Sequence, residues 1–150
     1  MGTHYQGTAA ATLALDAYIK LVRATETLSA RIHRPLAQAD LTVSQFGVLE
    51  ALWHLGPLCQ RDLGAKLLKS GGNITLVVDN LEKRGLVQRE RGTTDRRFIS
   101  VHLTATGSSL IQQLFPAHVE RVVANLSPLS STEQEQLAQL CKKLGLDSAN

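Results

Sequence analysis

The chain has 150 residues, 43% of them hydrophobic and 19% charged, and carries a formal net charge of +3 at pH 7. A chain of this length can fold as one domain without disulfide staples, burying about two thirds of its unfolded surface. Cys59 and Cys141 form no Cys-x-x-Cys pair, which argues against a disulfide scaffold or thiolate zinc site and favours a reducing, cytoplasmic location. We expect no membrane partner, because no apolar run approaches ~18 residues and residues 1–11 lack signal-peptide features.

Three helices are predicted in the first part of the chain. Residues 12–38 predict the first helix, because apolar side chains recur there at helical spacing. Pro35 should kink or end this helix. Thr42 and Gln45 form a capping box for the second, which Gly56 ends. Residues 60–68 predict a short third helix with Cys59 at its N-cap. The first helix has a broad apolar stripe of Leu15, Tyr18, Ile19, Val22, Leu28 and Ile32. The core residues expected from the second and third helices are Phe46, Leu49, Leu52, Trp53, Leu63 and Leu67.

The stretch from residue 70 to 103 predicts a helix followed by a two-stranded hairpin. Its helical part has one apolar stripe and should end at Gly85, a residue suited to a left-handed C-cap. Residues 86–91 and 99–103 then alternate as strands on either side of a loop at 92–97. The apolar residues of the helix and of the return strand are Ile74, Val77, Val78, Leu81, Ile99, Val101 and Leu103. Together these elements predict a winged helix-turn-helix over residues 42–103.

Positive charge is concentrated in this part of the chain. Residues 83–97 hold six basic side chains against two acidic ones, a local charge of +4 that leaves −1 for the rest. A short cationic element on a nearly neutral body suits contact with phosphates, because neutralised phosphates release condensed counterions. The alternative is an ordinary solvated hairpin.

Two more helices follow the hairpin. Thr104 should cap a helix to about residue 125 that Pro116 bends, and Ser130 with Glu133 forms a capping box for a last helix that Gly145 ends. The apolar stripe of this last helix contains Leu137, Leu140, Cys141 and Leu144, so Cys141 is expected to be a packing residue. The helices at 12–38 and 105–145 lie outside the winged part, and their apolar stripes predict a two-fold homodimer. The alternative is that they complete a monomeric core.

Several motifs resemble those of the multiple-antibiotic-resistance regulator (MarR) family. They are Leu81-Glu82-Lys83-Arg84-Gly85-Leu86-Val87, then Asp95-Arg96-Arg97, then Val101 to Gly107, with Leu41 to Phe46 as a weaker match. The resemblance implies one MarR-like domain over residues 1–150, mainly α with a small β-hairpin wing and flanking dimerisation helices. It also implies a ligand-responsive homodimeric repressor that binds an inverted-repeat operator in double-stranded DNA. Residues 46–50 and 74–79 are similar to members that respond to quinones and other aromatic electrophiles.

The resemblance assigns DNA-contacting roles to individual residues. Asp95 braces the wing through its arginines, while Arg97, with Arg96, enters a minor groove. In the major groove, Asn73 pairs with adenine and Leu76 meets a thymine methyl group. No arginine precedes Arg84 in this helix, so specificity should be A·T-leaning or shape-led. The DNA-binding set is Ser70, Gly72, Asn73, Thr75, Leu76, Asn80, Arg89, Arg96 and Arg97, and the phosphate candidates are Gln60, Arg61, Lys66 and Lys69, each with a solvated surface role as the alternative.

Family members often release DNA when a small aromatic or anionic compound binds. The candidate residues for an aromatic or phenolic effector are Tyr18, Arg23, His33, Trp53 and His54, because an aromatic ring beside a cation suits such a ligand. The alternative is core packing for Trp53 and a helix-end role for His54.

Other functions have less support. Cys59 is a redox candidate, because a helix N-terminus favours a thiolate, although free cysteines are often packing residues. The histidines show no metal-ligand spacing, and the sequence has no nucleophile-elbow motif. We therefore expect that the protein is not an enzyme and that it binds no cofactor or metal. The alternatives to a ligand-responsive repressor are a redox-sensing regulator that uses Cys59 and a winged-helix module for protein interaction or non-specific DNA binding.

Overall fold

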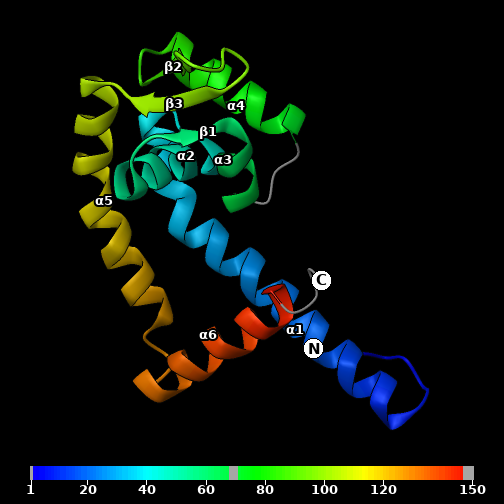
Figure 1. Cartoon of the computed structure of the whole chain (residues 1–150). Helices are drawn as coiled ribbons and strands as arrows, with labels where there is room; N and C mark the ends of the chain where they lie inside the picture. The colour runs from blue at the N-terminus through cyan, green and yellow to red at the C-terminus, as the bar shows by residue number, and fades with distance from the viewer. Residues whose placement is uncertain (1, 68–70, 147–150) are drawn as a thin grey trace. The chain divides into compact units, whose positions relative to one another are not determined.

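A computed structural model describes residues 2–67 and 71–146 of the chain (Figure 1). Two compact units are present, one of residues 33–117 and the other of the residues up to 32 together with those from 118 onward. The described part is mainly helical with one small antiparallel sheet, which confirms the predicted fold class. No helix among these residues is both long enough and apolar enough to cross a membrane.

The first helix ends earlier than the sequence predicts. α1 runs over Ala9–His33, and a 3-10 helix, η1, follows over Arg34–Ala39. Pro35 lies in the first turn of η1, where its fixed φ and missing N–H are tolerated. The proline therefore ends the α-helix, one of the two expected outcomes.

Local capping positions the next helices. In α2 (Val43–Leu55), the Thr42 hydroxyl accepts a hydrogen bond from the Gln45 N–H at 3.1 Å, and the Gln45 side-chain oxygen accepts one from the Thr42 N–H at 3.0 Å. This confirms the predicted capping box. Gly56 caps the C-terminus with φ of 78°. α3 covers Gln60–Lys66, and α4 covers Gly71–Lys83.

The sheet has three strands, so the expectation of a two-stranded hairpin was incomplete. β2 (Val87–Arg91) pairs with β3 (Ile99–Leu103), and the additional strand β1 (Leu58–Cys59) pairs with the other edge of β3. Leu58 is opposite Val101, and Cys59 is opposite Ser100. A strand of two residues is too short to produce an alternating pattern, which is why the sequence did not predict it.

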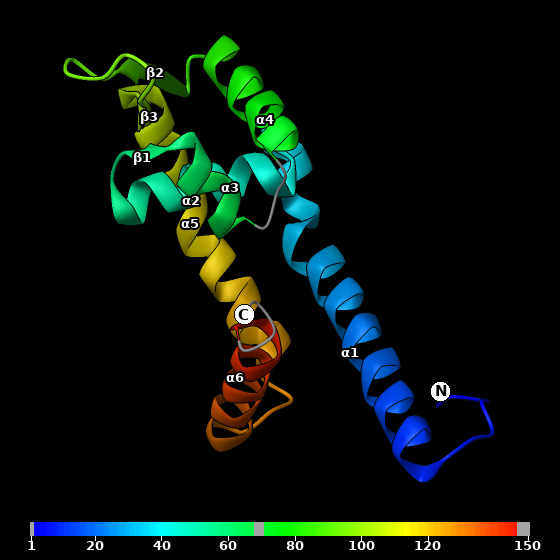
Figure 2. The same cartoon turned by 45° about the vertical axis from the view of Figure 1, so that its right-hand side comes forward.

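One hydrophobic core holds the elements of residues 33–117 together. It combines apolar side chains of α2, α3, α4 and the sheet with the start of α5 (Ala105–Leu126). Its largest fully buried members are Phe46, Leu49, Leu63, Ile74, Leu81, Ile111, Val48, Val78, Val87 and Val101. In both views, α4 and the β2–β3 hairpin lie on the same side of this unit (Figures 1 and 2).

The second half of α5 and α6 (Ser131–Leu146) belong to the other unit. Ser130 and Glu133 form the predicted capping box, whereas Gly145 lies within α6 instead of ending it. Cys141 is exposed, contrary to the expectation that it packs. The apolar face of α6 is uncovered here, since Leu140 and Leu144 are 62% and 63% exposed.

Candidate nucleic-acid interface

The wing, residues 87–103, presents arginines at its tip. Strands β2 and β3 pair from Val87 opposite Leu103 to Arg91 opposite Ile99. The loop closes with a hydrogen bond from the Gly92 N–H to the Phe98 carbonyl at 2.8 Å. Arg96 is exposed, and the Arg97 side chain is 93% exposed. The tip therefore offers two guanidinium groups to an external anion.

Asp95 organises this loop. Its carboxylate accepts hydrogen bonds from the Arg97 backbone N–H at 2.9 Å and from Arg97 Nε at 3.2 Å. The side-chain hydrogen bond from Arg97, followed by the backbone one, holds the pKa of Asp95 below its ordinary value. The contact orients Arg97 while leaving most of its side chain in solvent.

α4 has one buried and one exposed face. Ile74, Val78 and Leu81 are in the core, at most 2% exposed. Asn73, Thr75, Leu76 and Asn80 are exposed, and Leu76 is exposed to 60%. An apolar side chain left in water on a polar helix face suits contact with a thymine methyl group. Gly72 lies in the first turn of α4, while Ser70 and Lys69 fall outside the described residues.

Arg89 is placed differently from the wing arginines. Its side chain is 21% exposed, and its guanidinium group forms ion pairs with Asp79 at 2.6 Å and Glu82 at 3.0 Å. Gln60 accepts hydrogen bonds from the same group and donates one to the Thr75 hydroxyl at 2.7 Å. We call Arg89, Asp79, Glu82, Gln60 and Thr75 the Arg89 network. Arg89, Gln60 and Thr75 are thus engaged within the protein, whereas the phosphate candidates Arg61 and Lys66 are exposed.

Sequence reasoning missed the partners in this network. Asp79 and Glu82 lie on α4, and no local pattern links them to a strand residue that follows in the chain. It also missed Arg84, whose side chain donates hydrogen bonds to the carbonyls of Ala39 and Asp40 and so ties the end of α4 to η1. The only sequence signal for the Arg89 pairs was opposite charge at unrelated spacings, and the backbone acceptors of Arg84 gave no signal.

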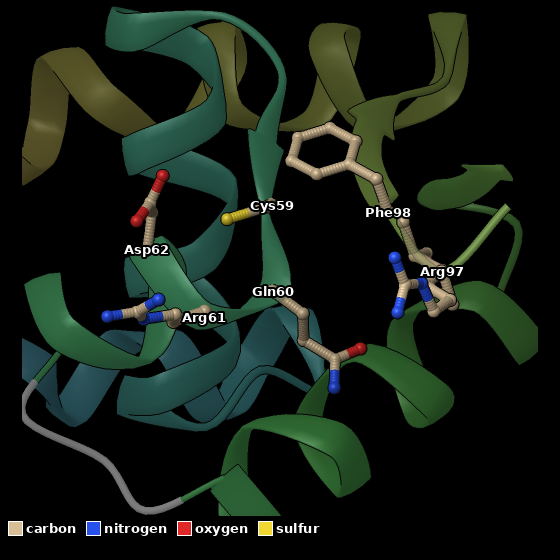
Figure 3. Close-up of a pocket in the computed structure, with 7 residues that line it drawn as sticks. Cys59, Gln60, Arg61, Asp62, Arg97 and Phe98 are labelled. Atoms are coloured by element: carbon tan, nitrogen blue, oxygen red, sulfur yellow. The ribbon is translucent and has the colours of Figure 1, made fainter. Parts of the chain in front are cut away.

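Cys59 lines a hollow of about 380 Å³ between the start of α3 and residues 97–99 of the wing (Figure 3). Figure 3 shows Arg97 and Phe98 on the wing side of this hollow, and Arg61 and Asp62 on the side of α3. Cys59 is at the N-cap of α3, but its side chain makes no capping hydrogen bond. Neither Cys59 nor Cys141 is in a disulfide. In the described part of the chain, no group of three or more His, Cys, Asp or Glu side chains could hold a metal.

The five effector candidates occupy different surroundings. Trp53 and His54 pack with Phe115, with ring centroids 5.2 Å and 4.9 Å from it. Trp53 therefore packs against the hydrophobic core, which was the alternative to a role in ligand binding. Tyr18 is 64% exposed, and His33 is half-buried. Arg23 lines an apolar hollow of about 380 Å³ formed by α1, the end of α5 and α6.

An exposed helix face beside an arginine-tipped hairpin defines the class of protein, a winged-helix DNA-binding regulator. The family model of MarR matches residues 41–99. An HTH-type transcriptional regulator of Bacillus subtilis, YkoM, is 35% identical over 90% of this chain and 88% of its own length. MhqR of the same organism is 33% identical over 89% of this chain and 92% of its own. The chain belongs to the MarR family of DNA-binding transcriptional regulators.

Solved structures agree with this assignment. The Staphylococcus aureus MepR–DNA complex superimposes with a TM-score of 0.74 at 25% identity, covering 93% of this chain and 98% of that one. NadR in complex with 4-hydroxyphenylacetate gives a TM-score of 0.74 at 27% identity, covering 96% of this chain and 97% of NadR. These matched proteins include one bound to DNA and one bound to a phenolic acid.

Proposed function

We propose that the protein is a homodimeric repressor that binds an inverted-repeat operator and is released by a small aromatic acid. The observation that carries the proposal is the common orientation of α4 and the wing. Asn73, Leu76 and Asn80 are exposed on α4, and Arg96 and Arg97 are exposed on the wing. These two elements lie on the same side of one unit (Figures 1 and 2). In this arrangement α4 enters a major groove while the wing reaches the adjacent minor groove.

The contacts have separate roles in this proposal. Asn73 hydrogen-bonds an adenine edge, Leu76 contacts a thymine methyl group, and Asn80 lies further along the same helix. Arg97, oriented by Asp95, inserts its guanidinium into a narrow minor groove, where the negative potential is enhanced. Arg61 and Lys66 bind phosphates and so fix the register without reading sequence.

Dimerisation is supported by the uncovered apolar side chains of the helices outside the winged part. Val123, Leu140 and Leu144 are each more than 60% exposed. Exposed apolar patches are typical of association sites. A two-fold axis would bury these stripes and would place two copies of α4 about one helical turn of DNA apart.

The hollow that Arg23 lines supports an aromatic acid as effector. Arg31 and several apolar side chains also line it, namely Leu28, Leu126, Leu129 and Leu137. A ring would pack on the apolar wall while a guanidinium binds the carboxylate. The complex of NadR with 4-hydroxyphenylacetate makes this compound the first probe. It should release DNA from the wild type and fail to release it from Arg23→Gln.

Selection from a pool of random duplexes tests the DNA-binding proposal. The wild type should enrich an inverted repeat, and it should bind that duplex at least a hundredfold more tightly than a scrambled one at physiological salt. Footprinting should show two protected major-groove segments about one turn apart, flanked by minor-groove protection. Equal affinity for selected and scrambled duplexes would instead favour a module for non-specific DNA binding.

A further inference from the structure

We propose that Arg89 is a positioning residue that holds α4 at a fixed orientation to the wing, and that it makes no contact with DNA. The inference rests on the proposed function, because it concerns how the two DNA-binding elements are kept in register. Arg89 is in the middle of β2, opposite Val101 of β3. Its guanidinium group faces α4 and the start of α3.

The contacts with α4 extend over two helical turns. Arg89 binds the Thr75 carbonyl at 3.3 Å, Asp79 at 2.6 Å and Glu82 at 3.0 Å. These positions are related as i, i+4 and i+7, so they lie on one face of the helix. Several attachment points along a helix restrict both its rotation about its own axis and its tilt, which a single contact cannot do.

Two further hydrogen bonds attach Arg89 to Glu82 of α4 and to Gln60 of α3. The second carboxylate oxygen of Glu82 accepts a hydrogen bond from the Arg89 backbone N–H at 2.8 Å, so Glu82 holds both the backbone and the side chain of the same strand residue. On the other side, Gln60 accepts from Arg89 Nε at 3.2 Å. The network therefore joins β2, α3 and α4 at one guanidinium group.

The charges of the network also matter for DNA binding. Arg89 offsets one of the two negative charges that Asp79 and Glu82 carry on α4, where their side chains are 43% and 41% exposed. Without Arg89, both would face the phosphates uncompensated and would repel them. A lysine would restore the charge but not the planar fork that binds several acceptors at once.

Substitutions of opposite charge separate positioning from simple electrostatics. Arg89→Gln removes a positive charge and Glu82→Gln removes a negative one, so an electrostatic role predicts opposite effects on DNA binding. A positioning role predicts that both lower the ratio of affinities for the selected duplex and its scrambled counterpart. We expect Arg89→Gln to lower this ratio about tenfold and Glu82→Gln to lower it less, while Glu82→Gln binds scrambled DNA more tightly.

Arg91→Gln is the matched control, because Arg91 is on the same strand two residues further on, is exposed, and undergoes the same change of charge. It should leave the affinity ratio unchanged. Binding is measured across salt concentrations, at a temperature where thermal melting shows each variant folded. The slope of log affinity against log salt should stay at the wild-type value in Arg89→Gln, because no phosphate contact is lost.

Three results would overturn the inference. These are an unchanged affinity ratio in Arg89→Gln, a slope reduced by about 1 as for a lost phosphate contact, and full recovery of the ratio by Arg89→Lys. If Arg89→Gln does not fold, the sign of the Glu82→Gln effect on the ratio decides the question. If the wild type prefers no duplex in the selection from random duplexes, the proposed function is wrong, and this inference, which rests on it, is wrong as well.

Discussion

The Asp95 carboxylate accepts hydrogen bonds from both the backbone N–H and the side-chain Nε of Arg97, at 2.9 Å and 3.2 Å. Two bonds to one residue orient the arginine without burying it, since the Arg97 side chain remains 93% exposed. An exposed but oriented guanidinium loses less conformational freedom on binding than a free one. This relationship between Asp95 and Arg97 leads to the first two predictions.

Arg97→Ala should weaken binding to the selected duplex about tenfold or more and reduce the salt slope by about 1, because one minor-groove cation is lost. Its melting temperature should stay close to that of the wild type, since the side chain is almost fully exposed. Fluorescence anisotropy with labelled duplex measures the affinity. Arg34→Ala, which removes an exposed arginine from η1, is the control and should bind normally. Unchanged affinity in Arg97→Ala would refute the assignment of the wing tip to DNA.

The ion pair of Asp95 should depend on pH in a defined direction. Because the hydrogen bonds from Arg97 lower the pKa of Asp95 in the folded protein, they stabilise the loop at pH values above the ordinary aspartate pKa of about 3.9. This contribution is lost as the pH falls through the lowered folded pKa, so neutral solutions retain it fully. An NMR titration of the Asp95 carboxyl carbon should give a midpoint below the ordinary one. In Arg97→Ala the midpoint should return towards it, and an unshifted wild-type midpoint would contradict the contact.

Gly107→Ala should destabilise the protein by about 1–3 kcal/mol, because overpacking a tight site forces the backbone to move. A Cβ atom at this buried position would stand 2.0 Å from the Leu86 carbonyl oxygen, which also accepts a hydrogen bond from the Thr104 N–H. Urea unfolding measures the free energy. Gly145→Ala in α6 is the matched control: nothing lies within 4 Å of its Cβ, so alanine should be neutral or slightly stabilising. Equal effects of the two substitutions would argue against this close approach.

The double substitution Leu140→Glu and Leu144→Glu should convert the proposed dimer into a monomer, because charges replace apolar side chains that are 62% and 63% exposed on α6. Sedimentation equilibrium should give the mass of one chain for this variant and of two for the wild type. Gln139→Glu, on the same helix, adds a charge at another exposed position and should remain dimeric. A monomeric wild type at high concentration would contradict the homodimer.

Residues with local signals were predicted well. The capping boxes at Thr42 and Ser130 and the buried face of α4 at Ile74, Val78 and Leu81 all agree with the structure. Such features depend on residues three or four positions apart, which the sequence displays directly. Arg89 was expected at the DNA, as one of the basic residues gathered between residues 83 and 97. Its actual partners, Asp79 and Glu82, are close to it only after β2 packs against α4.

By itself, the sequence determined which segments are helix or strand, apart from β1 and η1, and where positive charge gathers, because these properties arise from neighbouring residues and their side-chain spacing. The tertiary structure decided which arginines face solvent and which are held inside. Arg97 and Arg89 have the same chemistry and lie eight positions apart, yet one is exposed and the other is bound to two carboxylates. That difference depends on the packing of β2, α3 and α4 against each other, which no local pattern encodes.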